Sequence, residues 1–331
     1  MKEVCGELPF RFRAGAWKPR TSPHTFQGAG AEALKWLKEV KERFGIDVAT
    51  EVATPEQLHA ALDAGIDYLW IGARTSANPM AVSAIAEAIV DRLRLTEYRP
   101  ASPDRVQTGL PFKGILIKNP ANEDAGLWLG NIERLEKTGV PVMAVHRGCN
   151  HRPCWHMAHE VRLARPDIPM LLDPSHMSGD AEQVPLLLHK IDELGLDGAM
   201  VEVHCDPKSA LSDNNQQLTP RCLRDALDSI ACRLRVVSVF WTHYKHKELN
   251  WLRSEIDELD EQLWSTIAAR MEVSERIGDW KKEHNIAALQ PERYEQIVRE
   301  RSEWAKNNGL SEELVKQIFD LIHSESLRRQ Q

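Results

Sequence analysis

The stretch Gly114-Ile115-Leu116-Ile117-Lys118-Asn119 decides the fold, because it is a short apolar run that ends abruptly in polar residues. A continuous apolar run of this length is typical of a strand buried on both faces, as in a parallel sheet. Similar runs lie at 48–52, 68–72, 141–145, 169–173 and 198–203, and residues 10–13 end an earlier one. Amphipathic segments such as 31–44 and 56–64 lie between them. Alternating strands and helices predict an α/β fold, either a barrel or a doubly wound sheet.

The residues at the ends of these runs favour the barrel. Nearly every predicted strand ends in a charged or reactive side chain, and these are Arg13, Glu51, Arg74, Lys118, Arg147, Asp173 with His176, and Glu202 with His204. A (β/α)8 barrel gathers its active site at the C-terminal ends of many strands, whereas a doubly wound sheet concentrates its ligands at one switch point. Seven strands can be counted, so we expect a (β/α)8-type barrel that is one strand short.

From about residue 248 the pattern changes to that of a long amphipathic helix. Apolar residues recur at spacings of three and four, and these are Leu249, Leu252, Ile256, Leu259, Leu263 and Ile267. The pattern continues to about His284, which gives a helix of roughly 50 Å. Two more helices are expected, at 291–307 and 311–329. A helix this long predicts self-association, so we expect an all-α dimerising domain at 248–331, a barrel at 1–232 and a linker at 233–247.

The composition limits the classes of function. The 331 residues include 42 Lys and Arg against 49 Asp and Glu, and a net charge of −7 argues against a binder of nucleic acid or membrane surfaces. No apolar stretch approaches the roughly 18 residues that span a bilayer, and residues 1–7 lack the apolar stretch of a signal peptide. Six cysteines without a Cys-x-x-Cys pair are too sparse for a disulfide scaffold. We therefore expect a cytoplasmic enzyme.

Cations recur at or just after the predicted strand ends. They are Arg13, Lys18, Arg20, Arg74, Lys118 and Arg147. If the strands form a barrel, these side chains converge on one mouth and predict a strongly anionic ligand that carries phosphates and carboxylates. Any one of them could be an ordinary solvated loop cation, but the repeated placement argues against that interpretation for the set.

Three further side chains predict a metal site. His176, Glu202 and Asp213 offer one imidazole and two carboxylates, a set that suits a borderline-to-hard divalent ion such as Mn²⁺, Fe²⁺ or Co²⁺. The other interpretation is that Glu202 pairs with a neighbouring cation and His176 is structural. A second cluster consists of Cys149, His151, Cys154, His156 and His159. It invites a zinc interpretation, but its spacing fits no standard zinc pattern.

Several motifs together resemble the type I 3-deoxy-D-arabino-heptulosonate 7-phosphate (DAHP) synthases of the shorter subclass. The motifs are the segments 13–22 (Arg-Ala-Gly-Ala-Trp-Lys-Pro-Arg-Thr-Ser), 70–76, Lys118-Asn119-Pro120, His146-Arg147-Gly148, Asp173-Pro174-Ser175-His176 and 216–220. The resemblance implies the condensation of phosphoenolpyruvate with erythrose 4-phosphate in a metal-containing barrel. It implies that phosphoenolpyruvate is held by Arg13, Lys18, Arg74, Arg147 and Lys118, with Lys118 as the catalytic lysine. It further implies that Arg20 and Thr21 contact erythrose 4-phosphate, and that the metal held by His176, Glu202 and Asp213 polarises the aldehyde.

The chain departs from that family in three places. The family's first strand ends in Gly-Pro-Cys, whose cysteine is a metal ligand, whereas only 17 residues precede Lys18 here and Cys5 falls in an expected helix. An insertion at about 93–110 precedes the strand of Lys118, and the stretch after Gly148 is short. The strand that is missing is therefore the first one. Because two strand edges stay unpaired and one metal ligand of four is lost, we expect weak or absent DAHP synthase activity for the chain as given.

Three cations stand out on the long helix. Arg270 and Lys281 lie on nearly the same face about 16 Å apart, whereas Arg253 lies on a different face, about 25 Å from Arg270. Arg253 could therefore reach a ligand of Arg270 only across an antiparallel dimer. The alternative is that all three are solvated helix cations.

The helical motifs resemble the all-helical chorismate mutases. They are Leu252-Arg253-Ser254-Glu255-Ile256-Asp257, Ala269-Arg270, Ile277-Gly278-Asp279-Trp280-Lys281, Gln290-Pro291-Glu292-Arg293 and residues 324–330. The resemblance implies an intertwined dimer that converts chorismate to prephenate without a cofactor. Arg270 and Arg253 of the partner subunit would clamp the carboxylates, and Lys281 and Gln330 would act catalytically by donating to the ether oxygen. The remaining pocket residues would be Gln290, Arg293 and Ser326, while Tyr294 stands where many members have a glutamate. The alternative is a mutase with a non-catalytic, ligand-binding or regulatory barrel.

Overall fold

The computed structural model describes residues 2–6, 8–19, 24–95, 112–237, 247–287 and 289–330. The chain divides into two compact units, Met1–Glu255 and Ile256–Gln331. The division falls inside helix α12 (Lys247–Glu283), so that the first turns of this helix belong to unit 1. Each unit is described by itself.

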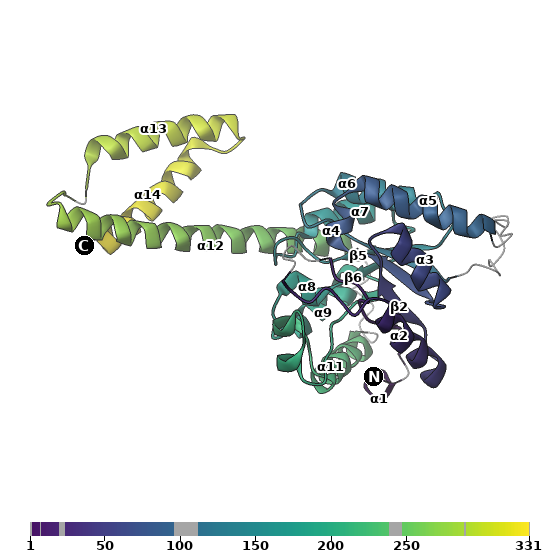
Figure 1. Cartoon of the computed structure of the whole chain (residues 1–331). Coiled ribbons are helices and arrows are strands. Elements are labelled where there is room, and N and C mark those ends of the chain that lie inside the picture. The colour runs from purple at the N-terminus through teal and green to yellow at the C-terminus, as the bar shows by residue number, and fades with distance from the viewer. Residues whose placement is uncertain are drawn as a thin grey trace. The chain divides into compact units, whose positions relative to one another are not determined.

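Unit 1 is built on one parallel sheet whose strands follow each other in chain order (Figure 1). The strands are β1 (Phe12–Arg13), β2 (Val48–Glu51), β3 (Tyr68–Ile71), β4 (Gly114–Lys118), β5 (Val142–His146), β6 (Met170–Leu172) and β7 (Gly198–Ala199). Each strand pairs in parallel with the next, and within the described part of the chain no ladder joins β7 back to β1. The prediction of a seven-stranded, barrel-type α/β sheet is confirmed.

The strands are apolar throughout because both faces of the sheet are covered. Ile115 and Ile117 of β4 belong to the large core shared with the helices, whereas Leu116 packs in a smaller cluster on the other face with Trp70 and Val145. Alternate residues of one strand thus serve two interiors, as expected for a barrel-type sheet.

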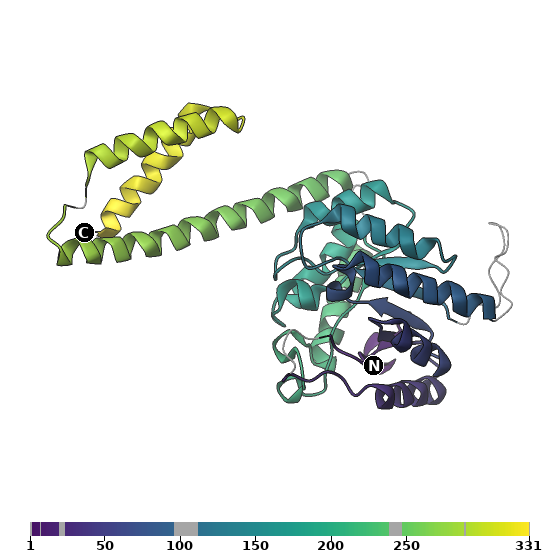
Figure 2. The ribbon, with the colours of Figure 1, turned by 45° about the horizontal axis from the view of Figure 1, so that its top comes forward.

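Helices cover the outer face of the sheet (Figures 1 and 2). They are α2 (Ala31–Phe44), α3 (Pro55–Asp63), α5 (Pro79–Leu95), α6 (Ala125–Glu136), α7 (Trp155–Ala164), α9 (Val184–Leu188), α10 (Lys190–Leu194) and α11 (Pro220–Val237). Shorter helices are α1 (Lys2–Cys5), α4 (Ala73–Ser76) and α8 (Pro174–Ser178), with 3-10 turns at Pro207–Ser209 and Asn214–Gln216. Side-chain caps fix several starts: Thr54 accepts from the N–H of Gln57, and Asp124 accepts from the N–H of Leu127.

The first turns of α12 pack into unit 1. The Trp251 side chain is only 3% exposed, and its ring stacks on His159 with 5.4 Å between centroids and 4° between planes. The ring of His159 also contacts Glu255, with 2.7 Å between Nδ1 and Oε1. Lys190 donates to the buried Ser254 hydroxyl at 3.1 Å. These contacts explain why the compact unit continues to Glu255.

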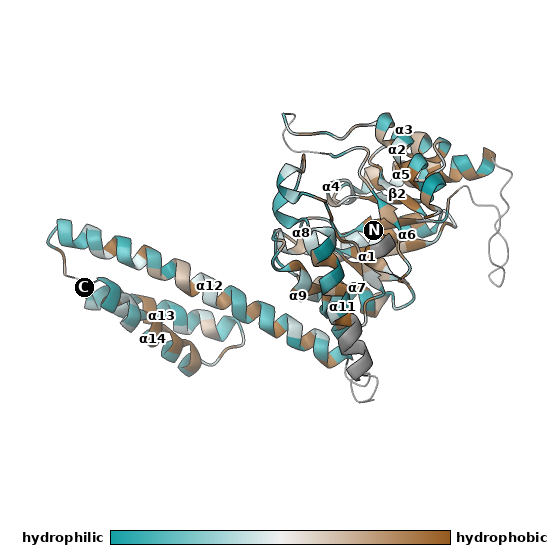
Figure 3. Ribbon diagram, turned by 90° about the horizontal axis from the view of Figure 1, so that it is seen from below, coloured by the Kyte–Doolittle hydropathy of each residue, from teal (hydrophilic) through white to brown (hydrophobic). Residues whose placement is uncertain are grey.

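Unit 2 consists of the remainder of α12 with α13 (Pro291–Asn307) and α14 (Glu312–Gln330), which confirms the predicted all-helical region. Gly278 of α12 permits close approach of α14, because a Cβ there would lie 2.7 Å from the Cα of Gln330. Apolar residues recur along the helices (Figure 3), yet many remain exposed: Leu259 is 62% exposed, Trp264 66% and Leu321 73%. Unit 2 of one chain therefore leaves much of its apolar surface uncovered.

Candidate functional site

A cavity of about 680 Å³ lies at the C-terminal ends of the strands. Its charged and polar lining residues include Arg13, Lys18, Glu51, Trp70, Arg74, Lys118, Arg147, Asn150, His151, His176, Glu202, Asp213, Gln216 and Gln217. The register of the sheet explains part of this convergence, because Lys118 pairs with Val145 and His146 pairs with Leu172. The residues that end or follow these strands therefore meet at one edge.

The structure brings together five of the six cations that the sequence placed at strand ends. Arg13, Lys18, Arg74, Lys118 and Arg147 all line the cavity. Arg20 and Thr21 lie outside the described residues. The same holds for most of the expected insertion at 93–110, since residues 96–111 are not described. Binding of a substrate by the five cations stays a prediction.

Lys118 and Asp173 form a buried ion pair at the base of the site, with 2.6 Å between Nζ and Oδ2. Asp173 also accepts a hydrogen bond from the backbone N–H of His176 at 3.1 Å. Burial alone would raise the pKa of Asp173, but the charges of His176 and Lys118 outweigh it and hold that pKa well below its usual range. An ionised Asp173 therefore fixes the Lys118 ammonium at the cavity wall.

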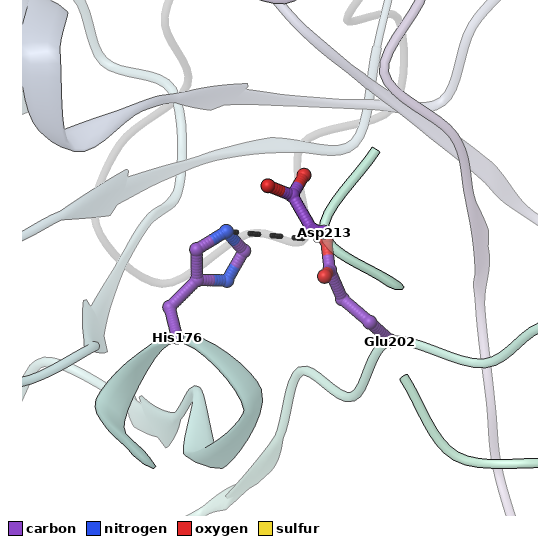
Figure 4. A group of neighbouring side chains, drawn as sticks. All are labelled: His176, Glu202 and Asp213. Carbon is purple, nitrogen blue, oxygen red and sulfur yellow. Dashed lines mark ion pairs between the residues drawn. The ribbon is translucent and has the colours of Figure 1, made fainter. Parts of the chain in front are cut away.

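His176, Glu202 and Asp213 form a compact group (Figure 4). One ligand atom from each lies within 4.8 Å of the others, and His176 Nε2 is 3.9 Å from Glu202 Oε1. Glu202 accepts from Gln216 at 2.8 Å, and Asp213 accepts from Lys18 at 2.9 Å. The donor set and its spacing fit a divalent metal with mixed nitrogen and oxygen ligands.

The zinc interpretation of the second cluster finds no support in the geometry. Among the described residues, His176, Glu202 and Asp213 form the only group of three or more potential ligands that come this close. His159 is turned toward Glu255, and the ring of His151 lies against Gly179. Cys5 ends α1, so it lies in a helix, where the sequence placed it.

Glu51 is a cavity residue to which the sequence assigned no role. It ends β2, accepts a hydrogen bond from the Trp70 indole at 3.2 Å, and owes its space to Gly72, where a Cβ would lie 2.1 Å from Glu51 Oε1. Burial raises the pKa of Glu51, although Lys118 opposes the shift. The sequence placed Glu51 among the strand-end residues without giving it an individual role, and that position accounts for its place in the cavity.

The helical residues expected to bind a second ligand form two pairs between α12 and α14. Arg270 donates to the buried Ser326 hydroxyl, and Lys281 donates to Gln330 Oε1 at 3.4 Å. Burial lowers the pKa of Arg270, and the nearby Arg301 lowers it further. Seven helical residues were predicted to bind this ligand. The structure pairs four of them: Arg270 with the hydroxyl of Ser326, and Lys281 with the amide of Gln330.

The other three predicted residues are not joined to these pairs. Arg253 belongs to unit 1, and Gln290 precedes α13 as its N-cap. Arg293 donates to Gln296 at 2.8 Å. Tyr294 donates to Asp320 at 2.5 Å, so this residue connects α13 to α14. That hydrogen bond raises the pKa of Tyr294.

Comparison with known proteins yields two family matches. Residues 1–90 and 143–233 match the family model of the DAHP synthetase I family. Residues 252–331 match that of chorismate mutase type II. Among the described residues, no helix combines the length and apolar character that crossing a membrane requires.

Individual relatives agree with these matches. The chain is 28% identical over 218 residues to a phospho-2-dehydro-3-deoxyheptonate aldolase of Thermotoga maritima, which covers 62% of this chain and 56% of the relative. It is 31% identical over 84 residues to a 4-amino-4-deoxychorismate mutase of Streptomyces venezuelae, covering 25% of this chain and 82% of the relative. A crystal structure of a Thermotoga maritima DAHP synthase matches with a TM-score of 0.56 at 23% identity, covering 72% of this chain and 64% of that one. The chain therefore spans less than two thirds of the length of each of the two Thermotoga maritima proteins.

Proposed function

We propose that this chain, which belongs to the DAHP synthetase I family and, through residues 252–331, to the type II chorismate mutase family, acts in the cytoplasm as a bifunctional enzyme of aromatic amino-acid biosynthesis. The barrel would condense phosphoenolpyruvate with erythrose 4-phosphate, and the helices would convert chorismate to prephenate. We propose domains at 1–232 and 248–331 with a linker at 233–247, although compact unit 1 continues to Glu255.

The barrel activity is supported mainly by the convergence of five cations and one metal-type group on a single cavity. Phosphoenolpyruvate carries a phosphate and a carboxylate, which bidentate guanidinium groups such as Arg74 and Arg147 bind well. Asp173 holds the Lys118 ammonium in place before the substrate arrives, so that little reorganisation is needed. A divalent metal held by His176, Glu202 and Asp213, which we propose to be Mn²⁺ with Fe²⁺ or Co²⁺ as alternatives, would supply Lewis-acid polarisation of the aldehyde carbonyl.

The open sheet favours a reduced rate. Within the described residues no strand joins β7 to β1, and the metal group supplies three ligands. We propose that the chain as given condenses its substrates slowly. The alternative is a barrel that binds ligands without catalysis.

Purified full-length chain with Mn²⁺ should show DAHP formation well below the roughly 10 s⁻¹ of a typical enzyme. A rate at or above that value would contradict the impairment. If phosphoenolpyruvate binds but no DAHP forms, the ligand-binding barrel is the correct interpretation.

The mutase activity is supported by the pairing of Arg270 with Ser326 and of Lys281 with Gln330. The rearrangement of chorismate needs no acid or base; it needs a dicarboxylate held in a reactive conformer and stabilisation of charge on the ether oxygen. Arg270 would hold one carboxylate, and Lys281 and Gln330 would donate to the ether oxygen. Gln290 and Arg293 would complete the pocket.

We propose that a homodimer through the helices completes this site with Arg253 of the partner subunit. The exposed apolar side chains of unit 2, among them Leu259, Trp264 and Leu321, support an interface that a second copy would cover. The direct test is prephenate formation from chorismate by the full-length chain, together with its mass in solution. Conversion no faster than the uncatalysed rate, or a catalytically active monomer, would contradict the proposal.

A further inference from the structure

Two cysteines flank a short loop whose tip forms part of the cavity wall. Cys149 lies three residues after the last residue of β5, His146, and Cys154 directly precedes α7 (Trp155–Ala164). The tip residues Asn150 and His151 line the cavity and have left-handed backbone conformations, with φ of 50° and 59°. Non-glycine residues rarely adopt this conformation, so the loop is held in a demanding geometry by its surroundings.

The loop holds its two thiols side by side. Cys149 and Arg152 exchange two backbone hydrogen bonds of 2.9 Å, which closes the loop. The Cys149 and Cys154 side chains are 0% and 1% exposed, and the Cys154 thiol lies against Cys149. Cys154 Sγ also lies 3.3 Å from Glu123 Oε1 and 4.0 Å from the Cys149 carbonyl oxygen.

Cys149 is connected to the anion-binding side of the cavity through Asn119. The Asn119 amide donates to Cys149 Sγ at 3.7 Å and to the Gly148 carbonyl at 3.0 Å. The same side chain accepts from the backbone N–H of Arg147 at 2.7 Å. Cys149 Sγ thus contacts the side chain of Asn119, which in turn contacts the backbone of Arg147, a cation that lines the cavity. A change at Cys149 Sγ can therefore reach Arg147 through Asn119.

The surroundings also favour reactivity of one thiol. The interaction with the Cys154 thiol lowers the pKa of Cys149; burial and the charge of Glu123 oppose this shift, and Arg147 and Arg152 add to it. A lowered pKa increases the thiolate fraction, and the thiolate is the reactive form. A small oxidant would reach this buried pair by local opening of the tip, whose residues Asn150 and His151 are exposed.

We propose that Cys149 and Cys154 are a reversible dithiol–disulfide site that is oxidised by a peroxide. The Cys149 thiolate attacks one peroxide oxygen, giving a sulfenic acid and, after protonation of the leaving hydroxide, one water. Cys154 then attacks the sulfenic sulfur, its proton leaves with the expelled hydroxide as a second water, and the S–S bond forms. Two electrons pass from the thiols to the peroxide, and a dithiol returns them on reduction.

Disulfide formation would move Cys149 Sγ from the Asn119 amide toward Cys154. Asn119 would lose one of its acceptors, and its hold on the Arg147 backbone would loosen. We expect about fivefold weaker binding of phosphoenolpyruvate by the oxidised chain. This effect on affinity rests on the function proposed above, whereas the disulfide itself does not.

The experiment treats the full-length chain with hydrogen peroxide under native conditions, alkylates the remaining thiols after unfolding, and maps the peptides. A Cys149–Cys154 link that dithiothreitol removes is expected. It should persist in a Cys205→Ser, Cys222→Ser variant, which lacks the two thiols that are exposed among the described cysteines, and be lost in Cys149→Ser. Oxidation of the exposed Cys205 shows that enough peroxide was present. If Cys149 and Cys154 are then still both alkylated, the proposal is overturned. This result comes from the wild-type peptides, so it does not depend on whether Cys149→Ser folds.

Calorimetric titration of the reduced and oxidised chains with phosphoenolpyruvate tests the consequence. Equal affinity of the two forms would overturn the connection through Asn119. Binding by neither form, with the disulfide mapped as expected, would contradict the proposed barrel function and leave the modification site supported.

Discussion

The cavity of unit 1 and the paired residues of unit 2 use cations in different ways. In the cavity, Lys118 is buried against Asp173, and each strand end contributes a residue to one edge of the sheet. In unit 2, Arg270 donates to the Ser326 hydroxyl and Lys281 donates to the Gln330 amide oxygen, on helices with exposed apolar side chains. The parallel sheet gathers a charged cavity within one chain, whereas the three helices of unit 2 leave apolar side chains exposed, and we propose that a second copy completes their site.

The largest effect, a loss of chorismate mutase activity, is expected from Arg270→Ala. It tests whether the cations of unit 2 serve to bind an anion. Arg270 faces Ser326 without an anionic partner among its described hydrogen bonds, so its charge is available to a carboxylate. Removing it should lower kcat/KM for chorismate by roughly 10³-fold. The exposed Lys282→Ala on the same helix is the control and should leave the rate nearly unchanged. Equal losses of kcat/KM in both variants would show that the activity depends on the overall positive charge of the helix and not on a contact between Arg270 and the substrate carboxylate.

The next effect concerns stability of unit 1. Asp173→Asn would leave Lys118 charged and buried without its carboxylate, which should lower the free energy of unfolding by about 3 kcal/mol. Asp167→Asn, which removes an exposed partner of Arg165, should change stability little. Urea unfolding followed by tryptophan fluorescence measures both. If the two variants had similar free energies of unfolding, the buried pair of Lys118 with Asp173 would contribute no more to stability than the exposed pair of Arg165 with Asp167.

The smallest effect is a pH dependence in unit 1. Burial between Trp128 and Trp155 lowers the pKa of His146 to about 4, although its Nε2–H donates to the Pro153 carbonyl. As the pH falls, His146 takes up a proton in the unfolded chain before it does so in the folded chain. The contribution of the neutral, buried His146 to the free energy of unfolding is therefore complete above about pH 6.5 and is lost as the pH falls toward 4. This one group adds at most about 1.4 kcal/mol per pH unit to the slope.

His146→Gln should make that slope shallower, and the exposed His156→Gln on α7 should not. Urea unfolding at several pH values between 4 and 7 is the measurement. An unchanged slope in the His146 variant would mean that other groups dominate acid sensitivity.

The strand ends could be predicted from sequence, and with them most of the cavity. Lys118 and Arg147 stand directly at the ends of apolar runs, and parallel strands bring such ends to one edge. Residues whose roles depend on contacts across the fold could not be predicted. The pairing of Tyr294 with Asp320 depends on how α13 meets α14, and that of Cys149 with Cys154 depends on a strained loop. Neither has a periodic pattern.

Helix α12 has a consequence for how such a fusion can be divided or recombined. Because Trp251 and Glu255 complete the interior around His159, the seam between the two modules runs through a helix and not through a loop. A barrel excised before residue 247 would expose the site that Trp251 fills. Any chimera that exchanges the mutase module must therefore keep residues 247–255 of this helix, about two and a half turns, with the barrel.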